Sequence, residues 1–259
     1  MLPAWVNMSD FLRRAGLPVN CSALIIGRKY SEILAGPIKN LGIEAVYLPD
    51  NPYVDERLSG HADLSAFHGG GNNLFLAPFL RNTDFSIIIK EKGFNIHFPE
   101  IKQNKFYPYD AALNACAFGD KLIYGKNITS CDVVNCFQRR GETTLISTKQ
   151  GYAGCSVCVV DENSIITSDR GIYKEAVKAG LEVLLVSAGY VSLTGFEYGF
   201  LGGASFKISA EKLCFTGTLD SHPDKIGIEK FLHERHVEPV YLTSLPVFDI
   251  GSAIPIMEK

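Results

Sequence analysis

GYAGCSVCVVDENSIITSD, residues 151–169, is the stretch that decides the fold. An apolar segment from Cys155 to Val159 leads into a polar turn at Asp161-Glu162-Asn163, and Ile165-Ile166-Thr167 follows the turn. β-branched residues on both sides of a polar turn predict a β-hairpin. We expect the thiol of Cys155 to lie on the first strand of this hairpin.

The same pattern recurs along the chain. Residues 108–126 place a polar turn at Gly119-Asp120-Lys121, and residues 199–217 place one at Ala210-Glu211. A further hairpin with a glycine-rich turn is expected between Gly60 and Pro78. Hairpins about 45 residues apart are typical of a repeat architecture.

The hairpins at residues 108–126, 151–169 and 199–217 are each followed by an expected helix and then by a strand. Apolar residues at helical spacing predict helices near residues 31–41, 129–140, 172–179 and 224–236. A short helix is also expected within residues 1–20, and a turn at Lys92-Gly93. The chain is therefore organised as copies of a hairpin, helix and strand unit.

The two ends of the chain predict how the repeats close. The strand at residues 21–27 has no hairpin partner before it, and residues 251–257 resemble a first hairpin strand with no partner after it. Pairing the two would complete a fifth unit and remove a free sheet edge. The sequence predicts one α/β domain over residues 1–259.

The predicted architecture is a five-fold pseudosymmetric α/β propeller. Its units begin near residues 61, 110, 153, 201 and 251, and the C-terminal strand closes the ring. An open three-layer α/β sandwich is the alternative that the same elements allow.

The composition excludes several classes of partner. The net charge is -3, and no Lys/Arg-rich run gives a footprint for nucleic acid. No apolar run reaches about 18 residues, so no membrane span is expected. The N-terminus does not read as a secretion signal, and seven cysteines in a chain of this size favour reduced thiols in the cytoplasm. The oligomeric state is left open.

Four stretches, GHADLSAF, KQGYAGCSVCVVD, EYGFLGGASFKI and DIGSAIPI, resemble the pentein superfamily, the guanidino-group-modifying enzyme fold. More narrowly, they resemble an uncharacterised bacterial branch of it. The resemblance covers most of the chain and implies the propeller fold. It also implies chemistry on guanidinium compounds, as in arginine and agmatine deiminases and dimethylarginine hydrolases. Those enzymes use a His, a Cys on a glycine-rich strand, and carboxylates that grip the guanidinium.

The resemblance carries over to named residues. His61 and Asp63 match a His-x-Asp pattern, and Cys155 follows the glycine of a glycine-rich strand two units later. Equivalent positions around a pseudo-five-fold axis face one central channel, so we expect the imidazole and the thiol to meet there. A thiolate attacks an amidinium carbon only near a proton donor, so Cys155 would be the nucleophile and His61 the general acid/base.

The terminal strand departs from the family pattern. The family's enzymes carry their nucleophilic Cys near the C-terminus, whereas this chain has Ser252 in a strand without a thiol. Either the site has moved to another unit of the ring, or the catalytic Cys is lost. Non-catalytic members exist in the superfamily, including a ribosome anti-association factor.

Further polar residues are candidates for substrate binding. Asp63 and Asp110 could grip a cation in the channel, with Asn114 four residues after Asp110. Glu197 could close the mouth of the site, and Ser205 lies at a similar place in its unit to that of Ser252.

Structural readings of the same residues stay open. Cys155 could be a small buried hydrophobe, and His61 and Asp63 a structural hydrogen bond. Asp110 could be a solvated turn residue, and Ser205 could satisfy local backbone groups.

Two functions follow from the sequence. The first is a hydrolase or transferase that cleaves a C–N bond of a guanidino or amidino compound, with no cofactor and no metal. The alternative is a non-catalytic pentein-fold protein that binds a small molecule or a macromolecular partner.

Overall fold

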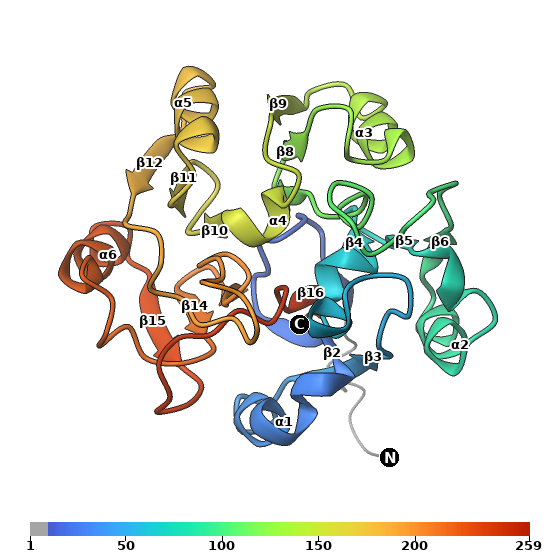
Figure 1. Cartoon of the computed structure of the whole chain (residues 1–259), viewed down its shortest axis with the longest axis horizontal. Coiled ribbons are helices and arrows are strands. Elements are labelled where there is room, and N and C mark those ends of the chain that lie inside the picture. Colours follow the sequence, from blue (N-terminus) through green and yellow to red (C-terminus); the bar gives the residue numbers. More distant parts are fainter. Residues whose placement is uncertain (1–9) are drawn as a thin grey trace, which may run out of the picture.

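The computed structural model describes residues 10–259. Within them it contains six α-helices and five small β-sheets. Figure 1 shows the sheets spread around the middle of the molecule, with α4 near the middle and the other α-helices toward the rim. The helix expected within residues 1–20 falls partly on residues 1–9, outside the described part, and residues 10–20 form the short strand β1 (Asp10–Phe11) and turns.

Four of the sheets repeat one order of elements. In the first, β4 (Ala66–His68) and β5 (Asn73–Leu76) form a hairpin, α2 (Asp84–Glu91) follows, and β6 (Asn95–His97) pairs parallel with β5. The other three have the same pairings. Their elements are β7 (Cys116–Phe118), β8 (Lys121–Gly125), α3 (Cys131–Gln138) and β9 (Thr144–Thr148); β10 (Cys158–Val159), β11 (Ser164–Thr167), α5 (Arg170–Lys178) and β12 (Glu182–Leu185); β13 (Ser205–Ser209), β14 (Lys212–Phe215), α6 (Lys225–His233) and β15 (Glu238–Tyr241).

The fifth sheet joins the two ends of the chain. Its four strands are β1, β2 (Cys21–Gly27), β3 (Glu44–Leu48) and the terminal strand β16 (Ile254–Glu258), in the order β1-β16-β2-β3, and α1 (Ser31–Asn40) links β2 to β3. β16 pairs antiparallel with β2, and β3 pairs parallel with β2. The C-terminal strand therefore takes the place that the first hairpin strand has in the other four sheets.

Local sequence explains most of these elements. Every residue of β2 is buried, as expected for the run CSALIIG. The side chains of Thr83, Ser130 and Asp169 accept hydrogen bonds from backbone N–H groups in the first turns of α2, α3 and α5. The predicted turn at Lys92-Gly93 is confirmed, since Gly93 has a φ of 92° just after α2.

Two segments differ from the predicted hairpin strands. Cys155 lies in a short helix, α4 (Ala153–Ser156), and the first strand of its hairpin contains only Cys158 and Val159. His61 and Asp63 lie at the start of a 3-10 helix, η3 (Ala62–Leu64), that precedes β4. The prediction that these side chains belong to strands is therefore wrong, because each chain segment makes a helical turn before its strand begins.

The first strands of the hairpins, together with β16, surround a central cavity of about 110 Å³. Residues of β4, β7, β10, β13 and β16 line this cavity. Asp63, Gly154, Gly202 and Ser252 line it as well, and each comes from the segment just before an inner strand. These preceding segments are therefore brought together at the centre of the fold. No helix among residues 10–259 has the length and apolar character that a membrane crossing needs.

Candidate functional site

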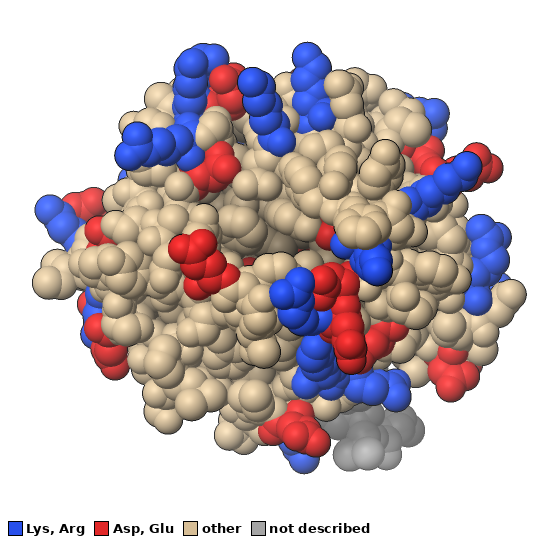
Figure 2. Space-filling view, in the orientation of Figure 1, with Lys and Arg blue, Asp and Glu red and all other residues tan. Residues whose placement is uncertain are grey.

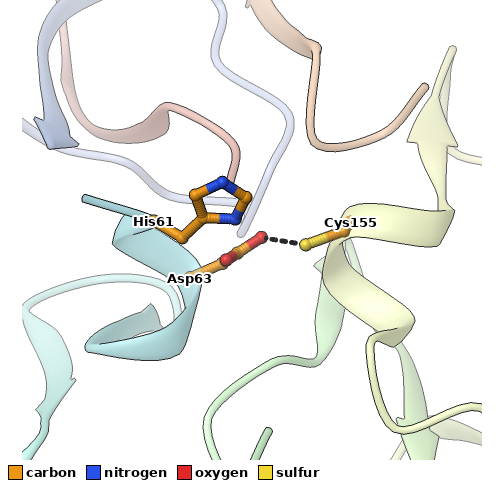
Figure 3. Close-up of side chains that lie close together, drawn as sticks. All are labelled: His61, Asp63 and Cys155. Carbon is orange, nitrogen blue, oxygen red and sulfur yellow. Dashed lines mark hydrogen bonds between the residues drawn. The ribbon is translucent and has the colours of Figure 1, made fainter. Parts of the chain in front are cut away.

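The segments that precede the inner strands bring polar side chains together in the middle of the molecule. Cys155 Sγ donates a hydrogen bond to Asp63 Oδ2 at 2.8 Å. One ligand atom from each of His61, Asp63 and Cys155 lies within 4.8 Å of the other two. Figure 3 shows the Asp63 carboxylate between the imidazole and the thiol. All three residues are 5% exposed or less, so this cluster is shielded from bulk water.

Asn114 holds the turn that carries the thiol. Its Oδ1 accepts hydrogen bonds from the backbone N–H groups of Gly154 at 2.7 Å and of Cys155 at 3.2 Å. Its Nδ2 donates to Cys155 Sγ at 3.1 Å. An amide side chain that satisfies two free N–H groups stabilises a helical turn, which explains why this apolar segment does not begin as a strand.

A neighbouring glycine gives the imidazole its room. Gly251 has a φ of 65°, and a Cβ on it would collide with the His61 side chain. The backbone of Gly251 also accepts a hydrogen bond from the Asp63 N–H at 3.1 Å. The segment before β16 therefore fixes both ends of the His-x-Asp motif.

Burial dominates the protonation of the thiol and its carboxylate partner. Burial raises the pKa of Asp63 to about 6, while His61 and the hydrogen bond from Cys155 act in the opposite direction. Burial, and then the charges of Asp63 and Asp249, raise the pKa of Cys155 well above its ordinary value of 9. Cys155 is therefore a neutral thiol at neutral pH in this arrangement, and it donates a hydrogen bond to the Asp63 carboxylate.

Three buried carboxylates have no Lys or Arg partner among the described residues. The charges of Asp63 and Asp249 act on the Cys155 thiol, and Asp110 binds Tyr152 in the segment before it. Asp63, Asp110 and Asp249 are all 5% exposed or less, and none forms an ion pair with a Lys or Arg of the described residues. Tyr152 donates its hydroxyl hydrogen to Asp110 Oδ2 at 2.6 Å, and burial raises the pKa of Asp110. The second oxygens of Asp63 and Asp110 have no hydrogen-bond donor in the described protein.

The third carboxylate, Asp249, is held by backbone groups. Its Oδ2 accepts from Phe200 N at 2.8 Å, and its Oδ1 accepts from Gly251 N at 2.8 Å.

Ser252, which occupies the left-handed region with a φ of 65°, donates its hydroxyl hydrogen to Asp63 Oδ2 at 3.2 Å. Sequence reasoning did not single out Asp249 or Tyr152. A carboxylate two residues before Gly251, at the start of the motif DIGSAIPI, is the available signal for Asp249.

The remaining candidates fall in different places. Asp110 and Asn114 belong to the site but lie in turns before β7, so the expected strand beginning at Asp110 is wrong: the N–H groups of Ala111 and Asn114 close local turns. Glu197 is exposed, unlike the buried residues of the cluster. Ser205 is buried at the start of β13, where it lines the central cavity beside Cys158.

The cluster allows two kinds of chemistry. A thiol, an imidazole and a carboxylate in contact suit covalent catalysis with proton transfer. The same three donor atoms are close enough to hold one divalent ion, since Cys, His and Asp are all ligands of zinc.

Comparison with known families places the chain. A family model described as a family of unknown function (DUF6873) matches residues 25–254. The chain belongs to this family. Comparison with the curated proteins gives no match.

Solved structures show the fold of this DUF6873 protein. The inosamine-phosphate amidinotransferase of Streptomyces griseus is similar with a TM-score of 0.60 and 9% identity, over 96% of this chain and 97% of that one. DDAH from Pseudomonas aeruginosa, in complex with citrulline, gives 0.53 and 10% over 90% and 96%. The agmatine deiminase of C. jejuni gives 0.53 and 10% over 91% of each chain. The fold is that of the pentein superfamily, as the sequence motifs predicted.

Proposed function

We propose that this protein acts on a small guanidinium or amidinium compound, with Cys155 as nucleophile and His61 as general acid/base. The observation that carries the proposal is the set of buried carboxylates, Asp63, Asp110 and Asp249, without an ion-pair partner in the described residues. Buried carboxylates without a cation are costly, and a bound cation would remove that cost.

The hydrogen-bonding pattern favours a planar cation with several N–H groups. Asp63 Oδ1 and Asp110 Oδ1 are buried acceptors without donors. A guanidinium presents its N–H groups in a fixed fork that matches carboxylate oxygens. An ammonium would offer a single point charge, so it would match this set less well.

The bound cation would also activate the thiol. A positive charge beside Cys155 lowers the pKa that burial and the carboxylates hold high. The thiol proton passes to the Asp63 carboxylate, and Sγ forms a bond to the guanidinium carbon. The C–N bond to the leaving amine breaks as protonated His61 gives its proton to that nitrogen.

The second half of the reaction restores the protein. Water adds to the carbon and gives one proton to His61. The C–S bond then breaks as the new hydroxyl becomes the carbonyl of the product, and the hydroxyl proton passes to the released ammonia or amine or to solvent. The sulfur takes the proton back from Asp63. In a transferase, an acceptor amine replaces the water, so both reactions use the same groups.

The structural neighbours support this class of substrate. They are an amidinotransferase, a DDAH bound to citrulline and an agmatine deiminase. At about 10% identity these likenesses concern the fold, so the proposal for this chain rests on its own residues.

The proposal also covers the arrangement of the repeats and the cellular compartment of the protein. We take residues 1–259 as one domain of five units around a pseudo-five-fold axis, closed by β16, because one strand of every sheet lines the same cavity. All seven cysteines are free, which supports a reducing compartment such as the cytoplasm.

A second candidate function is binding of the same cation without chemistry. Two observations favour it: the thiol of Cys155 serves as a hydrogen-bond donor to Asp63, and the terminal strand begins after Ser252 rather than a cysteine. The rate of alkylation at neutral pH separates the two candidates. If a guanidinium ligand speeds the alkylation of Cys155, the result supports catalysis. If the ligand only slows the alkylation, the result supports binding without chemistry.

The direct test is a panel of guanidino and amidino compounds. We expect one class to release ammonia or an amine, and mass spectrometry of the quenched reaction to find the added carbon on Cys155. Adduct and turnover together support the enzyme. Saturable binding without either leaves only the binding protein, and absence of any cation binding rejects both candidates.

A further inference from the structure

Four aromatic side chains form a connected group above the buried carboxylates. We call this group, Tyr107, Tyr152, Tyr198 and Phe200, the aromatic cluster. The ring of Tyr152 lies 5.1 Å from that of Tyr107 and 6.4 Å from that of Phe200, measured between centroids. Tyr198 meets Phe200 edge to face at 6.4 Å. The group thus links three separate segments of the chain.

The aromatic cluster is tied directly to the site. The Tyr152 hydroxyl donates to Asp110, and the Phe200 backbone N–H donates to Asp249. Tyr152 also precedes the helical turn that carries Cys155. Every aromatic group is therefore bonded to, or packed on a residue that is bonded to, one of the buried carboxylates.

Exposure places the aromatic cluster between the carboxylates and solvent. Tyr107 is 50% exposed and Tyr198 is 38% exposed, whereas Asp110 and Asp249 beneath them are 2% and 3% exposed. Figure 2 shows a hollow near the middle of one face, near the position of α4 in Figure 1, with mostly uncharged residues around it. A ligand that reaches the carboxylates from this side passes aromatic faces.

Arg57, which contacts the segment before Tyr198, is already engaged by other groups. Arg57 forms an ion pair with Asp55 and donates to Gly195 O at 2.6 Å. Its guanidinium also lies 4.1 Å from the centroid of the Phe196 ring. Arg57 is therefore committed to local partners and is poorly placed to receive the carboxylate of an amino-acid substrate.

We propose that the substrate is a guanidinium or amidinium compound whose other end is aromatic or apolar, rather than a guanidino amino acid. The inference rests on the proposed function, since it assigns the cation to the buried carboxylates. The aromatic cluster then holds the rest of the molecule by ring stacking and by burying apolar surface.

Calorimetric titration of the Cys155→Ala protein with four probes tests the inference without turnover. The probes are phenethylguanidine, propylguanidine, arginine and phenethylurea. We expect phenethylguanidine to bind about tenfold more tightly than propylguanidine, the order of gain that one aromatic contact provides. We expect arginine to bind more weakly than propylguanidine, because three buried carboxylates oppose its carboxylate.

Two variants assign the effect to the aromatic cluster. Tyr198→Ala should reduce the ratio of the phenethylguanidine and propylguanidine affinities several-fold. Tyr173→Ala is the matched control, since Tyr173 on α5 is 36% exposed and lies outside the cluster. It should leave the ratio unchanged.

The outcomes separate this inference from the proposed function. Equal affinity for the two guanidines, or tighter binding of arginine, overturns the aromatic assignment while the cation site stands. Equal affinity for phenethylguanidine and phenethylurea rejects the cation site and with it the proposed function. If none of the probes binds, both proposals are rejected.

Discussion

The segments before β10 and before β13 occupy equivalent places in their units and do opposite things. Residues 151–156 present side chains to the site, including Tyr152 and Cys155. Residues 199–203 contain three glycines and present mainly backbone. Gly203 N donates to Cys155 O at 2.8 Å, and Gly203 O accepts from the N–H groups of Ile250 and Ser252 at 3.0 Å. One segment presents the Cys155 thiol, and the other holds that segment in place through backbone hydrogen bonds.

The difference explains why glycine is needed in the second segment. A Cβ on Gly202 would collide with the carbonyl groups of Cys155 and Val157, and a Cβ on Gly203 would collide with the Asp249 carboxylate. Neither residue has a positive φ, so close approach of the neighbours, and not backbone conformation, excludes a side chain. Site geometry in this fold depends as much on the absence of side chains as on the reactive ones.

The largest expected effect is a loss of turnover on changing Cys155, in residues 151–156. Cys155→Ala should lower turnover of a guanidinium substrate by about 10³-fold or more, because no other thiol belongs to the site cluster. Steady-state kinetics measure this loss. Cys158→Ala is the matched control, since that cysteine is equally buried three residues later, and it should retain most of the activity. Equal losses in the two variants would mean that the effect is structural.

A side chain in the glycine segment should damage the fold instead. Gly202→Ala forces the Cβ against two backbone carbonyl groups, which cannot rotate away. We expect the free energy of unfolding in urea to fall by about 3 kcal/mol. Gly227→Ala in α6 is the control, because a Cβ there meets nothing within 4 Å, and alanine should raise stability by about 0.5–1 kcal/mol. A Gly202→Ala protein of wild-type stability would contradict the close packing of the two segments.

Asp63 should make the stability of the protein depend on pH. Its pKa is about 6 in the folded protein against an ordinary value of 3.8, chiefly because of burial. The folded state therefore holds this proton more tightly, so the carboxylate costs stability as pH rises from about 4 to 6, and the full cost is present above pH 6. The difference between these two pKa values corresponds to a loss of about 3 kcal/mol in the free energy of unfolding.

The measurement is urea unfolding of the wild-type and Asp63→Asn proteins between pH 4 and 7. We expect similar stability near pH 4 and a gain for Asp63→Asn that grows up to pH 6 and then levels off. Asp120→Asn, a change in a carboxylate at the surface beside Lys121, should show no such growth. A gain that is independent of pH would contradict the buried, proton-holding carboxylate.

Local patterns predicted the units but not the conformation of the site. The hairpin turns at Gly119-Asp120 and Ala210-Glu211 and the strand 21–27 depend on neighbouring residues alone, and they match the structure. The turn at Cys155 depends on Asn114, 41 residues earlier in the chain, whose amide caps it. An isolated apolar segment reads as a strand, so the helical turn could not be inferred from it.

The same limit applies to the acidic residues. Asp63 and Asp110 lie next to recognisable motifs, whereas Asp249 is defined by backbone partners at Phe200 and Gly251. Pairing between segments about 50 residues apart leaves no periodic signal in the sequence. Asp249 opens the motif DIGSAIPI, but its backbone partners, and so its place in the site, follow only from the fold.

The smallest expected effect concerns Asp110, the carboxylate that binds Tyr152 of residues 151–156. Asp110→Asn keeps an acceptor for the Tyr152 hydroxyl but removes a negative charge from the site. We expect the affinity of the Cys155→Ala protein for propylguanidine to fall about tenfold, a loss in the range of one hydrogen bond to a charged group. Calorimetric titration gives the value, and Asp120→Asn serves as the control because it removes an exposed carboxylate instead. The loss should be absent for an uncharged ligand such as phenethylurea, since only a cation uses the charge of Asp110. A loss of the same size for both ligands would place the role of Asp110 in holding Tyr152 rather than in binding the cation.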